Sequence, residues 1–171
     1  MNRRKAIKSL SIATGTIITL PAWMVSCGIA DRQEHNTRFS KKQQQLIASV
    51  ADTIIPAGTA IGALTVETDK YIQKVLDDCY EQPVQENVKK QLDALDKKAE
   101  ETYRKFFREC SQKERETLLL KFSDSTNKDE KEFFTLMKSE TIRGFNTSQK
   151  VMEDYLGYKV APGHYHGCVP V

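Results

Sequence analysis

The chain has 171 residues, of which 29% are charged, and it contains only eight glycines and five prolines. That balance favours helices over a β-sandwich or a barrel. Of the 26 Lys and Arg residues, four lie in the first eight positions, and the remaining 22 face 23 Asp and Glu residues. The net charge outside this head is −1, so the basicity of the whole chain is no argument for nucleic-acid binding.

The N-terminus has the order of an export signal. Arg3 and Arg4 form an adjacent pair in a basic head, an uncharged and moderately apolar run extends from Leu10 to Trp23, and no acidic residue precedes Asp31. This order predicts a cleavable leader over residues 1–27, and the arginine pair indicates the twin-arginine route, which carries folded proteins. The apolar run is too short for a membrane span, which needs about 20 residues. The alternative interpretation is an N-terminal amphipathic or anchor helix.

Two processing routes fit the end of this leader. Met24-Val25-Ser26-Cys27 resembles a lipoprotein box, with the small Ser26 before the thiol and Met24 in place of the usual leucine. In that case Cys27 becomes the first mature residue and carries lipid. The other route is cleavage by a signal peptidase near Ala30. The alternative for Cys27 is a plain cysteine in a disordered linker. Both routes predict a periplasmic protein, and lipidation would also anchor it to the membrane.

A polar linker over residues 28–39 leads to a helical domain that we expect over residues 40–157. Ser40 and Gln43 form a Ser-x-x-Gln capping box that opens the first helix, and Pro56 ends it. We expect this helix to bury Leu46, Ile47, Val50, Ala51 and Ile54.

The second helix is expected from about Val66 to the turn at residues 81–83. Its predicted inward side chains are Ile72, Val75, Leu76 and Cys79. Pro83 suits the first turn of a third helix that extends to about Arg104. Apolar residues in it recur at steps of three and four: Val84, Val88, Leu92, Leu95, Ala99, Tyr103 and Phe106.

Three further helices are predicted in the C-terminal part of the domain. Ser111 and Glu114 form a second capping box, which starts a helix that buries Leu118, Leu119 and Phe122. After a polar break at residues 123–127, a fifth helix runs from about Asp129 to Gly144. Its predicted inward residues are Phe133, Phe134, Leu136, Met137 and Ile142. A short sixth helix over residues 148–156 is capped by Asn146 or Thr147 and closed by Gly157. The fold class is therefore an all-α bundle of five to six helices, with an extended tail over residues 158–171.

The four cysteines are Cys27, Cys79, Cys110 and Cys168. Cys79 and Cys110 flank the third helix, which would hold them about 30–40 Å apart if it is unbroken. A disulfide needs Cα atoms within about 7 Å. We therefore expect Cys110 to be a buried thiol and Cys79 to be unpaired, whereas a bend in the third helix would permit a bond between them.

The sequence offers little catalytic chemistry. It contains no Gly-rich dinucleotide motif, phosphate loop or nucleophile elbow. His164 and His166 with Cys168 suggest a metal site in an enzyme, but two histidines alone are not a site, and contacts in a docking tail explain them more simply. The acids and bases of the helices are expected to face solvent. We predict no catalytic, cofactor or metal site on this chain.

Several segments resemble the gluconate 2-dehydrogenase subunit 3 family. The most specific is the ending Pro162-Gly163-His164-Tyr165-His166-Gly167-Cys168-Val169-Pro170. The other segments that carry the resemblance are 51–56, the Gly62-Ala63 loop, 133–136, 141–148 and 155–158. The resemblance covers residues 39–171, which is the whole expected mature domain.

This resemblance implies a non-catalytic small subunit of an exported sugar dehydrogenase. Its large partner would be a flavoprotein of the glucose–methanol–choline type that holds FAD, and a cytochrome c subunit carrying haem c would often accept the electrons. The small subunit would escort the flavoprotein through the twin-arginine translocase. On that interpretation Tyr158, Pro162, Tyr165, Cys168 and Val169 contact the flavoprotein, with Cys168 bonded to it or packed at the interface. The alternative is a free-standing helical lipoprotein that acts as a binding module.

Overall fold

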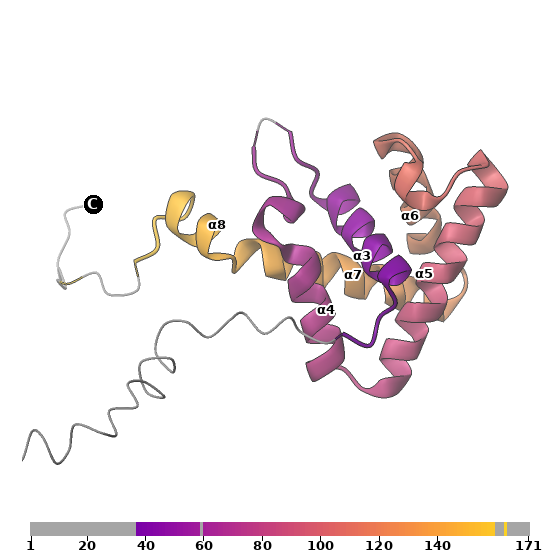
Figure 1. Cartoon of the computed structure of the whole chain (residues 1–171), viewed down its shortest axis with the longest axis horizontal. Helices are drawn as coiled ribbons and strands as arrows, with labels where there is room; N and C mark the ends of the chain where they lie inside the picture. The colour runs from indigo at the N-terminus through magenta and orange to yellow at the C-terminus, as the bar shows by residue number, and fades with distance from the viewer. Residues whose placement is uncertain (1–36, 59, 160–162, 164–171) are drawn as a thin grey trace, which may run out of the picture. The chain divides into compact units, whose positions relative to one another are not determined.

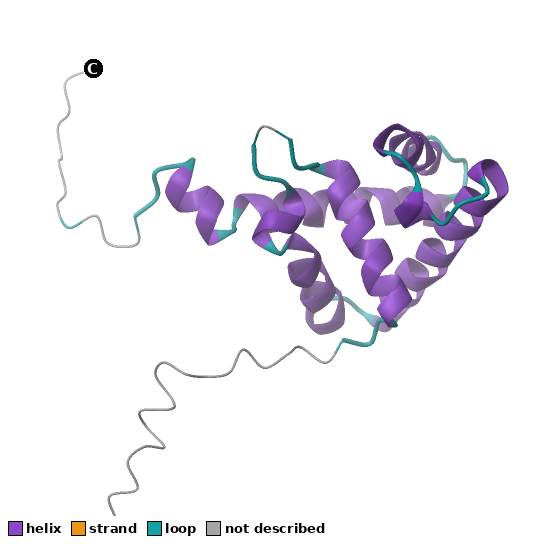
Figure 2. Cartoon of the chain, turned by 45° about the horizontal axis from the view of Figure 1, so that its top comes forward, coloured by secondary structure: helices purple, strands orange, loops and turns teal. Residues whose placement is uncertain are grey.

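A computed structural model describes residues 37–58, 60–159 and 163. These residues form six α-helices and two short 3₁₀ helices, and no strand occurs among them (Figures 1 and 2). The all-α prediction is therefore confirmed. The elements in chain order are α3 (Lys41–Ile54), η1 (Ala63–Val66), α4 (Thr68–Cys79), α5 (Gln82–Tyr103), η2 (Phe107–Glu109), α6 (Gln112–Ser123), α7 (Lys128–Asn146) and α8 (Gln149–Asp154).

The start of α3 is fixed by its own sequence. The Ser40 side chain accepts a hydrogen bond from the Gln43 backbone N–H, and the Gln43 side chain accepts one from the Ser40 N–H. This is the predicted capping box, which satisfies two of the donors that a helix start leaves open. The helix buries Leu46, Ile47, Val50 and Ala51, whereas Ile54 is only partly buried.

A left-handed residue separates η1 from α4. Glu67 has φ 55°, so α4 begins at Thr68, two residues later than the sequence predicts. Ile72 and Leu76 are fully buried as expected. The prediction for Cys79 is wrong, because this residue lies at the last position of α4 and its side chain is exposed.

The end of α5 corrects a second prediction. Arg104 adopts φ 58° and ends the helix, so the i, i+3, i+4 register does not continue to residue 106. Phe106 is consequently 44% exposed, and Phe107 in η2 is fully buried in its place. The buried carboxylate of Asp96 fixes this turn, since its Oδ1 accepts the Phe107 backbone N–H at 2.9 Å.

The helices α6 and α7 follow the sequence closely. The Ser111–Glu114 capping box opens α6, which buries Leu118, Leu119 and Phe122. Helix α7 continues through Gly144 to Asn146, because this glycine lies at a close helix contact and is not a terminator. Phe133 and Met137 are buried as predicted, but Ile142 is 40% exposed and does not belong to the core.

The N-cap position of the last helix, α8, is Ser148, one residue after Thr147 and two after Asn146, and its side chain makes no capping hydrogen bond. Gly157 has φ +62°, a left-handed conformation that glycine adopts without strain, and it follows the helix as expected. The predicted tail over residues 158–171 lies outside the described residues except for Tyr158, Lys159 and Gly163. The predicted leader over residues 1–27 and most of the linker also lie outside them.

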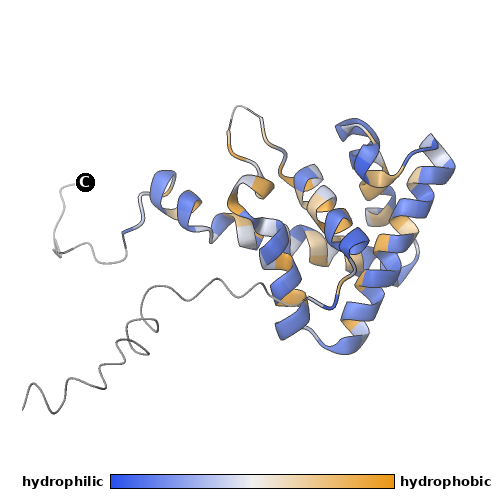
Figure 3. Cartoon of the chain, in the orientation of Figure 1, coloured by the Kyte–Doolittle hydropathy of each residue, from blue (hydrophilic) through white to orange (hydrophobic). Residues whose placement is uncertain are grey.

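Helix α7 is the centre of the bundle. It contacts α3, α4, α5, α6 and η1, and the rings of Phe122 and Phe133 meet with centroids 5.9 Å apart. The ribbons of α3 to α7 alternate between hydrophilic and hydrophobic stretches in Figure 3, as expected for helices that bury one face. Cys110 is a buried free thiol as predicted, and Cys79 is also free. In the part of the chain that the structure describes, no helix is both long and apolar enough to cross a membrane.

Candidate partner-docking surface

The structure describes one of the predicted interface residues. Tyr158 is 50% exposed, in the segment that follows α8. The other predicted site residues lie outside the described part of the chain: Arg3, Arg4, Cys27, Pro162, Tyr165, Cys168 and Val169. The residues around Tyr158 are therefore the described part of the predicted docking surface.

Residues 148–159 form a segment that we call the C-terminal arm. It consists of α8 and the turn after it, in which the Tyr158 N–H donates to the Met152 carbonyl at 2.9 Å. Val151 is buried, and α8 contacts α7. In Figure 1, α8 lies beyond the C-terminal end of α7. Tyr155 and Leu156 are 58% and 63% exposed. Large side chains with an apolar body and a polar tip are typical of protein interfaces, so the arm has the composition of a docking element.

A buried carboxylate holds the part of α7 from which the arm continues. Glu140 is 2% exposed, and its Oε1 accepts a hydrogen bond from the Tyr80 hydroxyl at 2.9 Å and forms an ion pair with Arg143 at 3.1 Å. Its Oε2 accepts a longer bond from the Tyr71 hydroxyl at 3.4 Å. Because both tyrosines belong to the α4 region, this network ties the C-terminal half of α7 to α4.

The surroundings of the two tyrosines in this network raise their pKa values. Burial raises the pKa of Tyr71 above its ordinary value, and the negative charge of Glu140 raises it further. Burial also raises the pKa of Tyr80, helped by its hydrogen bond to Glu140. Both phenols therefore remain protonated donors at neutral pH, which keeps the carboxylate paired.

The same contact depends on a glycine. A Cβ at Gly144 would lie 2.4 Å from Cδ1 of the Tyr71 ring and 3.0 Å from two of its other ring atoms. A glycine at this position lets α7 approach the ring of α4 closely. The close approach and the Glu140 network together position the end of α7 and the arm that follows it.

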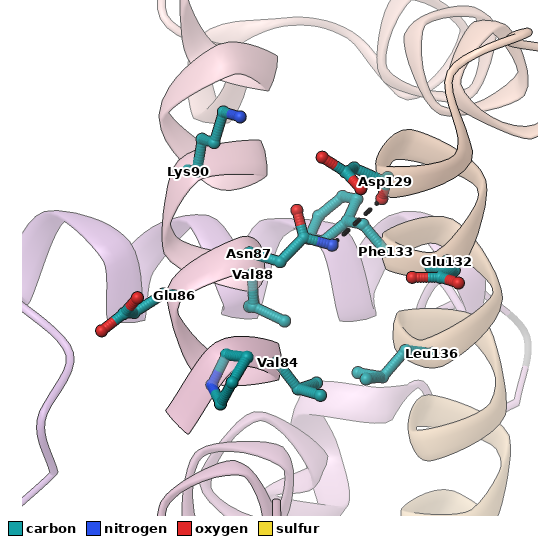
Figure 4. A pocket seen from close by; sticks show the side chains of 10 residues that line it. Val84, Glu86, Asn87, Val88, Lys90, Asp129, Glu132, Phe133 and Leu136 are labelled. Carbon is teal, nitrogen blue, oxygen red and sulfur yellow. Dashed lines mark hydrogen bonds between the residues drawn. The ribbon is translucent and has the colours of Figure 1, made fainter. Parts of the chain in front are cut away.

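A separate open groove of about 430 Å³ lies between α5 and α7 (Figure 4). Val84, Val88, Phe133 and Leu136 line it, and the Asn87 side chain crosses it to donate to the Asp129 carbonyl at 3.2 Å. The side chain of Glu86 points away from this hollow in Figure 4. The groove thus has an apolar floor, and Lys90, Asp129 and Glu132 are also among its lining residues.

The described residues offer no metal centre. Within 37–58, 60–159 and 163, no group of three or more His, Cys, Asp or Glu side chains is placed to hold a metal ion. The residues suggested for a metal enzyme, His164, His166 and Cys168, lie outside these ranges.

Two buried acids were not predicted from the sequence. Asp96 and Glu140 are 4% and 2% exposed, so the expectation that helix charges face solvent is wrong for both. Helical spacing places Glu140 on the same face as Phe133 and Met137. It places Asp96 on the same face as Leu92 and Ala99. An acid at a core position of an apolar stripe is the signal that identifies such residues.

Comparison with known proteins gives one family match. A family model described as Gluconate 2-dehydrogenase subunit 3 matches residues 41–163, which is more than half of the chain. No curated protein and no solved structure matches the chain.

Proposed function

Because the chain belongs to the gluconate 2-dehydrogenase subunit 3 family, we propose that it is the non-catalytic subunit of an exported, FAD-dependent sugar dehydrogenase. Membership itself implies a subunit of a dehydrogenase complex and hence partner subunits. The finer assignment places FAD and the oxidation of the sugar on a flavoprotein partner of the glucose–methanol–choline type. A third subunit with haem c would accept the electrons. Gluconate, glucose and a glycoside oxidised at its 3-position are the substrate classes that such complexes would use.

The exposed C-terminal arm is the observation that carries this proposal. Tyr155, Leu156 and Tyr158 are at least half exposed, and the arm is attached to a part of α7 that two tyrosines and a buried carboxylate hold in place. Aromatic side chains on a positioned element lose little conformational freedom when a partner covers them. We therefore assign the arm, with the predicted residues Pro162, Tyr165, Cys168 and Val169 that follow it, to contact with the flavoprotein.

The leader gives this subunit a second role. Arg3 and Arg4 carry the proposed twin-arginine signal, and a flavoprotein that has already bound FAD must cross the membrane folded. A small subunit that binds the flavoprotein in the cytoplasm would bring it along to the periplasm. If Cys27 is lipidated, the same leader would hold the mature complex at the membrane.

Affinity purification of the tagged, full-length chain tests the assembly. We expect a yellow flavoprotein that binds FAD to co-purify in a stoichiometric amount. The double variant Tyr155→Ser, Tyr158→Ser should recover at least about tenfold less of it, since each side chain is expected to be a buried anchor. Leu120→Ser is the matched control, because Leu120 is 58% exposed on α6 and should leave recovery unchanged. Wild-type chain that recovers no flavoprotein would refute the proposal and leave the free-standing binding module.

The export role has its own test. Replacement of Arg3 and Arg4 by lysine should leave the flavoprotein in the cytoplasm, measured by fractionation and FAD fluorescence. A flavoprotein that still reaches the periplasm in this variant would refute the escort role without affecting the assembly.

A further inference from the structure

The segment between α3 and α4 is unusual for this chain. The 14 residues 53–66, which we call the uncharged segment, contain no charged side chain, although 29% of the chain is charged. Thr53 and Ala63, near its ends, are buried, but the middle of the segment is not part of the core. Pro56, Ala57, Gly58 and Ala60 are exposed, and Leu64 is 43% exposed. Exposed residues in a loop of this protein would ordinarily include Lys, Glu or Asp.

Backbone hydrogen bonds join the described residues of the uncharged segment to one another. The Ala63 N–H donates to the Ile55 carbonyl at 2.9 Å and closes the base of the loop, and the Gly58 N–H donates to the Ala60 carbonyl at 3.2 Å. At Gly62 a Cβ would lie 2.4 Å from the Ala57 backbone nitrogen, so only glycine allows the two sides of the loop to pack this closely. The exposed apolar atoms are thus presented on a prepared surface, which reduces the entropy cost of binding.

The uncharged segment and the C-terminal arm lie at the same end of the bundle. The last turn of the uncharged segment, η1, contacts α7. Tyr71, which lies one turn into α4, packs against Gly144, five residues before α8 begins. Figures 1 and 2 both place the loop before η1 beside the arm. In Figure 3 this loop and η1 are mainly orange or pale, in contrast to the blue outer surfaces of α5 and α6.

Most of the exposed large hydrophobic side chains are gathered at this end. Seven large hydrophobic residues of the described part are exposed, and four of them belong to η1 and to the arm: Leu64, Tyr155, Leu156 and Tyr158. Of the other three, Ile142 lines a hollow beside Ser123 of α6, and Phe106 and Leu120 lie just past α5 and on α6, at the other end of the bundle. Such a concentration on one end marks an interaction site, whereas scattered exposed residues would not.

We propose that the uncharged segment is a second docking element, which together with the C-terminal arm binds a neutral, apolar surface of the catalytic flavoprotein. This inference rests on the proposed function and adds to it the place and the chemistry of the contact. The flavoprotein is the chosen occupant because the arm assigned to it lies beside the segment. The partner surface is neutral because any charge that it presents to residues 53–66 would be desolvated without a counter-charge.

Two substitutions at exposed positions test the segment without altering the core. Ala60→Asp places a charge in the contact, and Leu64→Ser removes an apolar anchor. Each is expected to weaken binding of the purified flavoprotein to the full-length chain by at least about tenfold, measured by titration calorimetry. The matched controls are Thr126→Asp and Leu120→Ser, also at exposed positions but away from this end, and they should bind within about twofold of the wild type. Unchanged thermal unfolding of all four variants shows that the fold is retained.

The outcomes separate this inference from the proposed function. If Ala60→Asp and Leu64→Ser bind normally while the Tyr155→Ser, Tyr158→Ser variant binds weakly, the segment is not a docking element and the accessory function stands. If the wild-type chain binds no flavoprotein, the proposed function fails and the inference fails with it. A wild-type dimer in sedimentation that Leu64→Ser converts to a monomer would identify a second copy as the occupant instead. Binding to neutral phosphatidylcholine vesicles that Ala60→Asp abolishes would identify a membrane, and both of these results would overturn the inference.

Discussion

The Tyr80 hydroxyl donates a 2.9 Å hydrogen bond to the carboxylate of Glu140, a residue 60 positions further along the chain. Tyr80 caps the end of α4, and Glu140 lies in the C-terminal half of α7 on its buried face. The bond therefore joins α4 to α7, two helices that are not consecutive in the chain. It fixes the end of the bundle from which the C-terminal arm continues.

Removal of this carboxylate should destabilise the bundle strongly. Glu140→Ala leaves the hydroxyls of Tyr71 and Tyr80 without their acceptor, and we expect a loss of about 2–4 kcal/mol in the free energy of unfolding. Arg143→Ala should cost less than about 1 kcal/mol, because the Arg143 side chain is 61% exposed and its ion pair is screened. Urea unfolding checks both values. Equal losses in the two variants would show that the ion pair, and not the tyrosine pair, holds the carboxylate.

The same tyrosines make stability depend on alkaline pH. Their pKa values in the folded protein are raised above the ordinary value of 10.0. A raised pKa means that the stabilisation is fully present below pH 10.0 and is lost as the pH rises through the folded pKa. Unfolding measured between about pH 8 and 12 should show this loss. A Tyr71→Phe, Tyr80→Phe variant, which has neither phenol, should show less of it, and an identical pH profile would contradict the assignment.

Asp96 and Lys42 form an ion pair at 2.8 Å. We expect removal of Asp96 to cost more unfolding free energy than removal of Lys42. Asp96→Ala leaves the Phe107 N–H buried without an acceptor, so we expect a loss of about 2–3 kcal/mol. Lys42→Ala should cost less than about 1 kcal/mol, since its side chain is 60% exposed. Thermal unfolding of the two variants compares them directly. A larger effect at Lys42 would mean that charge pairing, and not the backbone hydrogen bond, secures the turn after α5.

Gly144→Ala should destabilise the wild-type chain but stabilise a variant that lacks the Tyr71 ring, which tests the close packing of these two residues. Gly144→Ala in the wild-type chain should cost about 1–3 kcal/mol, because the new Cβ overlaps the Tyr71 ring. In a Tyr71→Ala background the ring is gone, and the same change should stabilise the chain by up to about 1 kcal/mol through helix propensity. A double-mutant cycle of unfolding free energies measures the difference. Destabilisation of the same size in both backgrounds would exclude the ring as the cause.

Features that depend on neighbouring residues could be predicted from the sequence. The capping boxes at Ser40 and Ser111 need only a partner three residues away, and both helices begin where the sequence indicates. The apolar stripes of α3, α6 and α7 were also largely correct, because helical spacing determines which side chains share a face. The exposure of Tyr158 agrees with its predicted role in docking, although its partner contact remains a prediction.

Features that depend on backbone exceptions or distant partners could not be predicted. Nothing in Arg104 or Glu67 announces a left-handed conformation, yet Arg104 decides that Phe107 and not Phe106 is buried. The tyrosine partners of Glu140 lie 60 and 69 positions away in the chain, so the sequence indicated a solvent-exposed charge at this position. The sequence predicts only a connection between the helix that ends at Pro56 and the helix that starts at about Val66, and the structure shows that apolar residues of this connection are exposed beside the arm.

The contrast between local caps and the Tyr80–Glu140 bond also bears on the order in which the chain assembles. The starts of α3 and α6 close over three residues, whereas the bond to Glu140 closes a loop of 60 and forms only after the entropy cost of that closure is met. Local contacts of this kind favour fast folding. We therefore expect the Tyr80–Glu140 bond to form late in folding, so that its loss accelerates unfolding more than it slows folding. The network at Glu140 would then slow the unfolding of the end of the bundle that carries the C-terminal arm.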